Sequence, residues 1–412
     1  MITKILTLSA LAAACGAACA QNASSVTLYG IADAGVSRVS GLKQGTDTKL
    51  ASGIMEGSRF GLRGNEDIGG GYRAVFTMES RLELNSGSLS NRAASGTQVP
   101  DRLNTASLLG LPGALQPAVS AVAASIGSGI GVNLTNNFWD RQIFIGLVTP
   151  FGAVLAGRQY TPAYEISAAF DTMQTQSSLA AGQVASIPAS IDIRVSSALA
   201  YRAQFGPMSA TLMRTVEDPG SNKTLMGFSG MYKTEAFAVG LGYNSRKNEL
   251  GVKSLTSTVL GASAQVGPGT ISGILGAIKD DNPSDLSTIT ATFTPSAGAV
   301  NAGIVQAAFI NALKQDGRLT HIGYRLPTGP HTFYVAYTSF NDKRPNNADV
   351  ASYGAAYSYS FSKRTDLNLV ATHFNNKGLA QAAPGAAWYL GGVTATAGTD
   401  STSLAMGLRH RF

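Results

Sequence analysis

The sequence predicts an all-β protein, a 16-stranded antiparallel transmembrane β-barrel. Many segments alternate between apolar and polar residues, their connections alternate between short and long, and no stretch after residue 20 has the 18 continuous apolar residues of a membrane helix. Inside lipid, only helices and closed barrels satisfy every backbone polar group. A chain without a membrane helix that enters a membrane must therefore cross it with strands.

The N-terminus indicates export. The chain opens with a short basic region and an apolar run that ends in small residues. Ala18-Cys19-Ala20 fits a cleavage site, so we expect residues 1–20 to be a removed signal peptide and residues 21–412 to be the barrel domain. The competing interpretation is a lipoprotein signal acylated on Cys15 or Cys19, but neither cysteine has an aliphatic residue three positions before it.

Composition excludes several kinds of site. Both cysteines lie in the expected signal peptide, so the remaining chain can form neither a disulfide nor a thiolate metal site. The net charge of +7 falls to +6 once Lys4 is removed. Because basic and aromatic clusters are few, we expect no nucleic-acid partner and look for the positive charge on an inner surface.

The alternating segments define the strands. Between Ser352 and Phe361, aromatic residues and alanine alternate with small and polar residues, which gives one apolar face and one polar face. The strands are expected near residues 26–37, 57–66, 70–84, 138–149, 151–159, 193–204, 207–217, 224–234, 236–247, 252–265, 269–281, 317–326, 331–341, 350–361, 365–375 and 402–412.

The connections separate into two groups. Tight turns are expected at residues 66–71, 149–152, 205–207, 266–269, 327–330 and 361–364, and long connections at residues 38–56, 85–137, 160–192, 282–316 and 376–401. Short turns at one end and long loops at the other are typical of an outer-membrane barrel. The longest connection contains a mildly apolar run that Gly and Pro interrupt too often for a membrane span, so we expect it to fold over a neighbouring subunit or to be mobile.

Catalytic and cofactor motifs are weak. The four histidines show no H-x-x-x-H spacing, so no metal site is expected. Gly69-Gly70-Gly71 lies between two strands and indicates a hairpin turn, not a phosphate-binding loop. No G-x-S-x-G elbow occurs in a suitable context. We expect neither an enzyme nor a cofactor.

Five segments together are similar to one known family. They are "SSVTLYGIADAGV" (24–36), "SRFGLRGNEDIGGGYRAVFTMES" (58–80), "PFGAVLAGRQY" (150–160), "SFSKRTDLNLVATH" (360–373) and "GLRHRF" (407–412). In this order they resemble the Gram-negative trimeric general-diffusion porins of the β-proteobacterial type. The resemblance covers essentially the whole chain after the signal peptide.

The resemblance implies a homotrimer in the outer membrane, in contact with its lipids and lipopolysaccharide. It also implies a third loop, residues 161–192, that folds into the lumen and carries Glu165, Asp171 and Asp192. The chain departs from the family pattern in two ways. Its connections at 85–137 and 282–316 are long, and its third loop has few acidic residues.

The resemblance further implies a basic wall opposite the third loop. The matching positions are Arg59, Arg141 and Arg194, and strand parity adds Arg158. With Glu165 and Asp171 as the opposing acids, these arginines predict a net positive constriction, since charges facing each other across a narrow lumen are weakly screened.

Arginine suits such a wall because its pKa stays far above neutrality even among like charges. The alternative is that some of these arginines bond loop backbone or pair with Glu79 and Asp33 inside the wall.

The expected function is therefore passive diffusion of ions and small hydrophilic solutes, with weak anion selectivity. A second hypothesis is a substrate-selective channel on the same barrel, with Tyr160, Tyr164 and Phe170 forming an aromatic path, although these rings could instead pack the loop against the wall. A third is a surface adhesin that acts through the long loops.

The last strand closes the barrel. Leu404, Met406, Leu408 and Phe412 lie on one side of the alternation, and we expect them on the apolar exterior with Arg409 and Arg411 facing water. The resemblance implies that Phe412 is the signal read by the barrel assembly machinery. The small outward residues of the first strands are expected in the subunit interface: Gly30, Ala32, Ala34 and Gly64.

Overall fold

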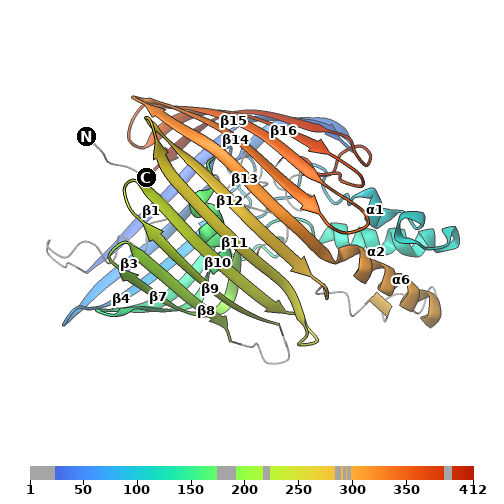
Figure 1. Cartoon of the computed structure of the whole chain (residues 1–412), viewed down its shortest axis with the longest axis horizontal. Helices are drawn as coiled ribbons and strands as arrows, with labels where there is room; N and C mark the ends of the chain where they lie inside the picture. Colours follow the sequence, from blue (N-terminus) through green and yellow to red (C-terminus); the bar gives the residue numbers. More distant parts are fainter. Residues whose placement is uncertain are drawn as a thin grey trace.

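The chain forms a closed antiparallel barrel (Figure 1). The computed structural model describes residues 24–173, 192–216, 223–283, 289–290, 294, 298–384 and 392–412, so the expected signal peptide lies outside the described residues. The strands are β1 (Ser25–Leu42), β2 (Gly45–Ser52), β3 (Arg59–Gly69), β4 (Tyr72–Arg81), β5 (Gln142–Thr149), β6 (Gly152–Tyr160), β7 (Arg194–Phe205), β8 (Met208–Thr215), β9 (Thr224–Lys233), β10 (Phe237–Lys247), β11 (Lys253–Val266), β12 (Gly269–Asp280), β13 (Gln315–Thr328), β14 (His331–Asp342), β15 (Val350–Ser360), β16 (Thr365–Asn376) and β17 (Ser401–Arg411).

Two of these strands share one position in the wall. The first half of β1 pairs with β3 and the second half pairs with β2, so β2 and β3 are two parts of one barrel strand, separated by residues 53–58. The 17-stranded sheet therefore has the predicted 16 positions, and it closes where β1 pairs with β17.

The prediction of a long connection at residues 38–56 was wrong. Residues 45–52 form β2 and make a tight hairpin with β1. The sequence of β2, "GTDTKLAS", has no apolar face, because polar residues outnumber apolar ones on both of its sides. A strand without an apolar face gives no alternation signal.

The two faces of the wall differ as the alternation predicts. On β17, Leu404, Met406 and Leu408 are exposed on the outer surface, while Ser403, Ala405 and Arg409 are buried on the inner side. The prediction for the last strand is confirmed on this point. An apolar outer band and a polar lumen are what a lipid-embedded barrel requires.

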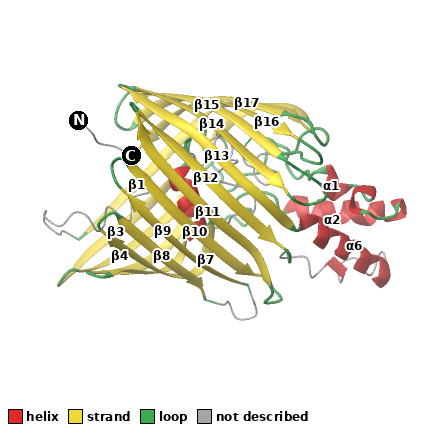
Figure 2. Ribbon diagram, viewed as in Figure 1, coloured by secondary structure: helices red, strands yellow, loops and turns green. Residues whose placement is uncertain are grey.

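The helices lie in two of the long connections and in the third loop (Figure 2). They are α1 (Asp101–Asn104), η2 (Ser107–Leu109), η3 (Gly113–Leu115), α2 (Gln116–Ser128), α3 (Pro162–Phe170) and α6 (Ala299–Leu313). Among the described residues, every helix is too short or too polar to cross a membrane. None of these helices was predicted from the sequence.

Candidate functional site

The helix α3 is fixed to the inner wall at its N-terminus. Thr161 is its N-cap and accepts a hydrogen bond from the Tyr164 backbone N–H. On β10, Asn244 donates to Thr161 Oγ1 (3.0 Å) and accepts from the Ala163 N–H (3.2 Å). One asparagine thus satisfies both the cap and a free N–H of the first turn, which ties the third loop to the barrel wall.

The apolar side of α3 packs on the same wall. Phe170 and Ile166 are buried in a cluster with Val259 and Ile274 of β11 and β12. Gly261 on β11 makes room for the Phe170 ring, since a Cβ at this position would lie 2.1 Å from Phe170 Cδ2. The first part of the expected constriction loop therefore lies flat against the inner wall, while residues 174–191 lie outside the described part of the chain.

The three rings of the alternative aromatic path are mostly buried. Tyr164 and Phe170 are 2% and 1% exposed, and Tyr160 stacks on Tyr164 with 5.2 Å between ring centroids. These rings hold the loop against the wall. Tyr160 itself is half-buried.

The acids of the third loop all contact the wall. Glu165 pairs with Arg202 of β7 at 2.5 Å, and Asp192 pairs with Arg246 of β10 at 2.8 Å. Asp171 is buried, with its Oδ1 4.0 Å from His321 Nε2 of β13. Glu165 therefore lies against β7, the strand that also carries Arg194, whereas Asp171 lies against β13, across the ring from β5.

Arg141 is held by Glu79. Its Nε donates to Glu79 Oε1 at 2.6 Å, and the side chain of Arg141 is 1% exposed. Tyr29 donates to the other oxygen of Glu79, and the Arg63 guanidinium lies 3.9 Å above the Tyr29 ring. The alternative considered for the predicted arginines, a pair with Glu79 inside the wall, is what Arg141 forms.

Arg194 and Arg158 are held by neutral groups. Tyr160 Oη accepts from Arg194 Nη2 (2.8 Å) and from Arg141 Nη2 (3.1 Å), and the Arg194 guanidinium also lies 4.5 Å from the centroid of the Tyr160 ring. Arg158 donates to the Asp140 carbonyl oxygen and to Ser196 Oγ. Among the described residues, both arginines are therefore held in place by hydrogen bonds to neutral groups and by the Tyr160 ring.

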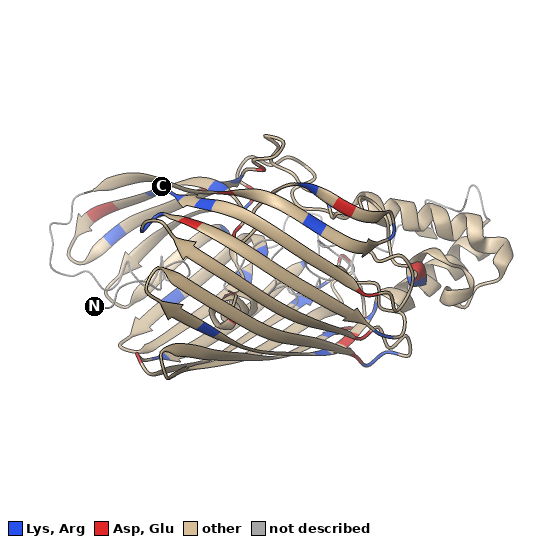
Figure 3. Ribbon diagram, turned by 90° about the horizontal axis from the view of Figure 1, so that it is seen from above, with Lys and Arg blue, Asp and Glu red and all other residues tan. Residues whose placement is uncertain are grey.

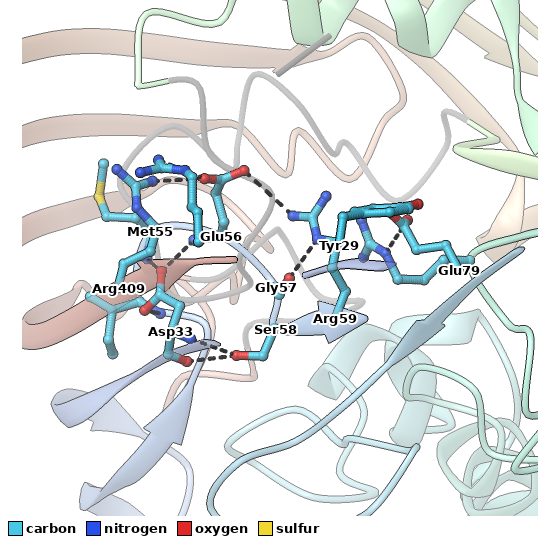
Figure 4. A network of polar contacts seen from close by, with 12 residues as sticks. Tyr29, Asp33, Met55, Glu56, Gly57, Ser58, Arg59, Glu79 and Arg409 are labelled. Carbon is cyan, nitrogen blue, oxygen red and sulfur yellow. Dashed lines mark hydrogen bonds and ion pairs between the residues drawn. The ribbon is translucent and has the colours of Figure 1, made fainter. Parts of the chain in front are cut away.

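Arg59 belongs to a separate network at the closure of the barrel (Figure 4). Glu56, in the break between β2 and β3, lies 3.5 Å from Arg59 and accepts from Arg409 (2.9 Å) and Arg411 (3.0 Å). Asp366 of β16 accepts from the same two C-terminal arginines. We call this group of five side chains the seam network, because it joins β3, β16 and β17 where the ring closes.

Asp33 places Glu56 in that network. Its buried carboxylate accepts the backbone N–H groups of Ile54 (2.9 Å), Met55 (3.0 Å) and Glu56 (2.8 Å), and its own backbone N–H and C=O both bond Ser58 Oγ. The break between β2 and β3 thus folds around one aspartate (Figure 4). Glu56 and Asp366 were not singled out from the sequence, which predicted that Arg409 and Arg411 face water. Arg409 is instead buried and donates to both acids.

The predicted basic wall is therefore divided. Arg141, Arg158 and Arg194 meet around Tyr160 and Asp140, whereas Arg59 turns toward Glu56. Within the described part of the chain, no three His, Cys, Asp or Glu side chains form a group that could hold a metal ion.

Comparison with known proteins gives the family. A family model described as Gram-negative porin matches residues 7–379, which is most of the chain. The chain belongs to the Gram-negative porin family. This porin is accordingly an outer-membrane β-barrel of a Gram-negative bacterium.

The individual matches are more distant. An outer membrane porin of Bordetella pertussis is 39% identical over 101 residues, which are 21% of this chain and 26% of that protein, so the aligned part spans about a quarter of the relative's length. Among solved structures, the anion-selective porin from Comamonas acidovorans has a TM-score of 0.68 at 21% identity, and the match covers 95% of this chain and all of that chain. The trimer form of OmpT from Vibrio cholerae has a TM-score of 0.60 at 13% identity, again with 95% and 100% covered.

The C-terminal residue of this porin lies in the closing seam. Phe412 exchanges two backbone hydrogen bonds with Gly30, each 3.1 Å long. Its ring covers Gly30, where a Cβ would lie 2.3 Å from Phe412 Cζ. Gly64 is filled in the same way by the ring of Phe76. Two of the four small residues expected in the subunit interface are thus covered by aromatic rings of their own chain.

Proposed function

We propose that this porin is a channel for passive diffusion of ions and small hydrophilic solutes, with a weak preference for anions. The observation that carries the preference is the unequal pairing of charges on the inner wall. Glu165, Asp192 and Glu79 are each paired with an arginine, whereas Arg158 and Arg194 are held by a carbonyl, a hydroxyl and a phenol. Unneutralised positive charge in a narrow aqueous lumen lowers the free energy of an anion there.

The composition of the third loop agrees with this proposal. Its segment from residue 174 to residue 191 has no charged residue in the sequence, so it brings no additional acid to the arginines. The Comamonas acidovorans porin compared above is anion-selective.

We also propose a homotrimer. The OmpT structure with a TM-score of 0.60 is a trimer form, and the outer faces of β1 and β17 expose apolar side chains such as Val36 and Met406 beside the half-buried Ala32 and Ala34. A subunit interface would cover these residues as well as a lipid would. Chemical cross-linking of the folded protein in detergent checks the stoichiometry, and a monomer that conducts would contradict it.

The anion preference is tested by reversal potentials across a planar bilayer in a potassium chloride gradient. The expected result is a chloride-to-potassium permeability ratio above one. Arg194→Gln should lower this ratio, because it removes one unneutralised charge, whereas Arg194→Lys should nearly preserve it.

The matched control removes both members of one ion pair, whose charges sum to zero. The double variant Arg202→Gln with Glu165→Gln leaves the net charge unchanged, so its ratio should stay close to the wild-type value. Cation preference in the wild-type protein, or equal ratios for Arg194→Gln and Arg194→Lys, would contradict the proposal.

A further inference from the structure

Two long connections build a helical cap at one end of the barrel (Figures 1 and 2). The first follows β4 and contains α1, η2, η3 and α2; the second precedes β13 and contains α6. We define the cap as residues 88–134 and 298–314. The cap lies at the end that carries the long connections, which is the extracellular end in outer-membrane barrels.

The two connections start from opposite sides of the ring. The pair β4 and β5 and the pair β12 and β13 lie eight positions apart among 16. A ring of 16 tilted strands spaced about 4.8 Å apart is roughly 30 Å across, which is far more than two side chains can bridge. The backbone of the connections must therefore extend over the mouth for them to meet.

The connections do meet, in a common apolar core. Leu103 of α1, Val119 of α2 and both Val305 and Phe309 of α6 are completely buried in one cluster. This core is separate from the cluster that seats α3 inside the barrel. The cap is thus a packed unit, not two independent loops.

Arg102 links the two halves of the cap. This buried side chain, in the first connection, donates to the Ala312 carbonyl oxygen at the end of α6 (3.1 Å). Burial lowers the pKa of Arg102 to about 10. Arg344, between β14 and β15, donates to the same carbonyl at 3.3 Å, so the C-terminal end of α6 is held from both sides.

Within the described part of the chain, further anchors of the cap lie on one half of the rim. Lys43 of the β1–β2 turn pairs with Asp101 at 2.5 Å, and Gln381, after β16, accepts from the Asp101 N–H at 2.6 Å. Ser95 accepts from the Val393 N–H ahead of β17. Together with Arg344, these contacts attach the cap to the arc that runs from β12 through β17 to β4.

In the opposite arc, from β6 to β11, one connection at this end is described in full, and it is short. The β10–β11 connection contains only residues 248–252. The helix α3 lies on the inner wall below this arc, against β9 to β12. The helix α3 and the anchors of the cap therefore lie mainly on different halves of the barrel.

The cap has almost no charge with which to select ions. Residues 105–139 and 286–313 contain no Asp, Glu, Lys, Arg or His. Figure 3 shows the helical region almost free of charged residues, in contrast to the strands. An uncharged obstruction acts on solutes through its bulk, because it adds no field to the lumen.

We propose that the cap is an outer size filter that covers the half of the mouth above β12–β17 and β1–β4. The filter depends on the channel activity proposed above but not on its charge preference. It makes the channel narrow at two levels, first at the mouth by bulk and then at the third loop.

The test is liposome swelling with a graded series of neutral sugars, from a pentose to a tetrasaccharide. The cap-deleted variant replaces residues 107–130 and 299–313 with short Gly-Ser linkers and so removes both halves of the apolar core together. We expect the swelling rate with the tetrasaccharide, relative to the pentose, to rise several-fold, with an unchanged reversal potential. An unchanged relative rate in a folded, conducting variant would overturn the filter. A wild-type protein that conducts nothing would overturn the proposed function instead.

A point variant tests the same idea without deletion. Arg102→Met removes the link between the two connections and should increase the permeation of large sugars. Arg92→Met is the matched control, because Arg92 donates to the Ser128 and Ile130 carbonyls within the first connection only. Equal sugar profiles for the two variants would contradict the bridged cap. A deleted variant that keeps the wild-type sugar profile but loses its oligomer would show that the cap is a subunit contact.

Discussion

Two parts of the inner wall hold arginines in different ways. In the seam network, Arg409 and Arg411 share the carboxylates of Glu56 and Asp366, so these four charges balance, and Arg59 adds one positive charge beside Glu56. Around Tyr160, two of the three arginines have neutral partners. The seam network lies where the ring closes, and the Tyr160 cluster lies on β5, β6 and β7, where the third loop leaves the wall.

The two kinds of partner give the arginines different roles, one in the stability of the barrel and the other in ion permeation. A balanced buried network contributes hydrogen bonds and geometry but little field, because its charges cancel at a distance. Arginines with neutral partners are held equally firmly and keep their field. We therefore expect variants in the seam to change the free energy of unfolding, and variants in the Tyr160 cluster to change ion selectivity.

The largest effect is expected for Asp33→Ala. The substitution leaves the N–H groups of Ile54, Met55 and Glu56 without their acceptor in a buried turn. An unsatisfied buried donor costs about 1–3 kcal/mol, so the total loss should reach about 4 kcal/mol or more. Urea unfolding in detergent, followed by gel mobility, measures it.

The control for Asp33 is Asp67→Ala in the exposed β3–β4 turn, where the carboxylate accepts a single N–H from Gly69. This variant should lose no more than about 1 kcal/mol. Similar losses for Asp33→Ala and Asp67→Ala would mean that the break between β2 and β3 does not depend on the buried carboxylate.

Arg141→Met is expected to have the next largest effect. Arg141 lies in the Tyr160 cluster but is paired like a seam residue, so its loss leaves Glu79 buried with its closest partner removed. Breaking a buried pair by removing one member typically costs about 3–5 kcal/mol. The same unfolding titration should therefore show a loss near 3 kcal/mol. A stable Arg141→Met variant with altered selectivity would place Arg141 among the residues that control permeation. Pairing with an acid would then not distinguish residues that control stability from residues that control selectivity.

Ionic strength gives the smallest and most specific effect. The Debye length falls from about 10 Å at 0.1 M salt to about 3 Å at 1 M. The anion preference should therefore decline as the salt concentration on both sides of the bilayer rises at a fixed gradient ratio. A preference independent of salt would point to a steric origin, not to the field of Arg158 and Arg194.

The sequence predicted the barrel well because each strand carries its own signal. Alternation marks the two faces of a strand whatever its neighbours are, as in β17. β2 was not predicted because it has no apolar face. The helices α2 and α6 were not predicted because they are stabilised by packing on each other and on α1. The sequence between α2 and α6 is about 170 residues long.

The site was predictable in residue type but not in pairing. Parity and family resemblance placed Arg59, Arg141, Arg158 and Arg194 on the inner wall. They could not show that Glu56 reaches Arg59, because this contact depends on the turn that Asp33 organises. Nor could they show that Glu165 faces Arg202, since this depends on where Asn244 and Gly261 seat the helix.

The pairing of Glu165 with Arg202 also affects the response to an electric field. Moving one elementary charge through a potential of 100 mV involves work of about 2.3 kcal/mol. Glu165 is the only charged residue in α3, and its partner is on the wall. A membrane voltage therefore acts on this helix through one carboxylate that is already held by an ion pair, a hydrogen-bonded cap and an apolar seat. We therefore expect α3 to resist displacement by voltage.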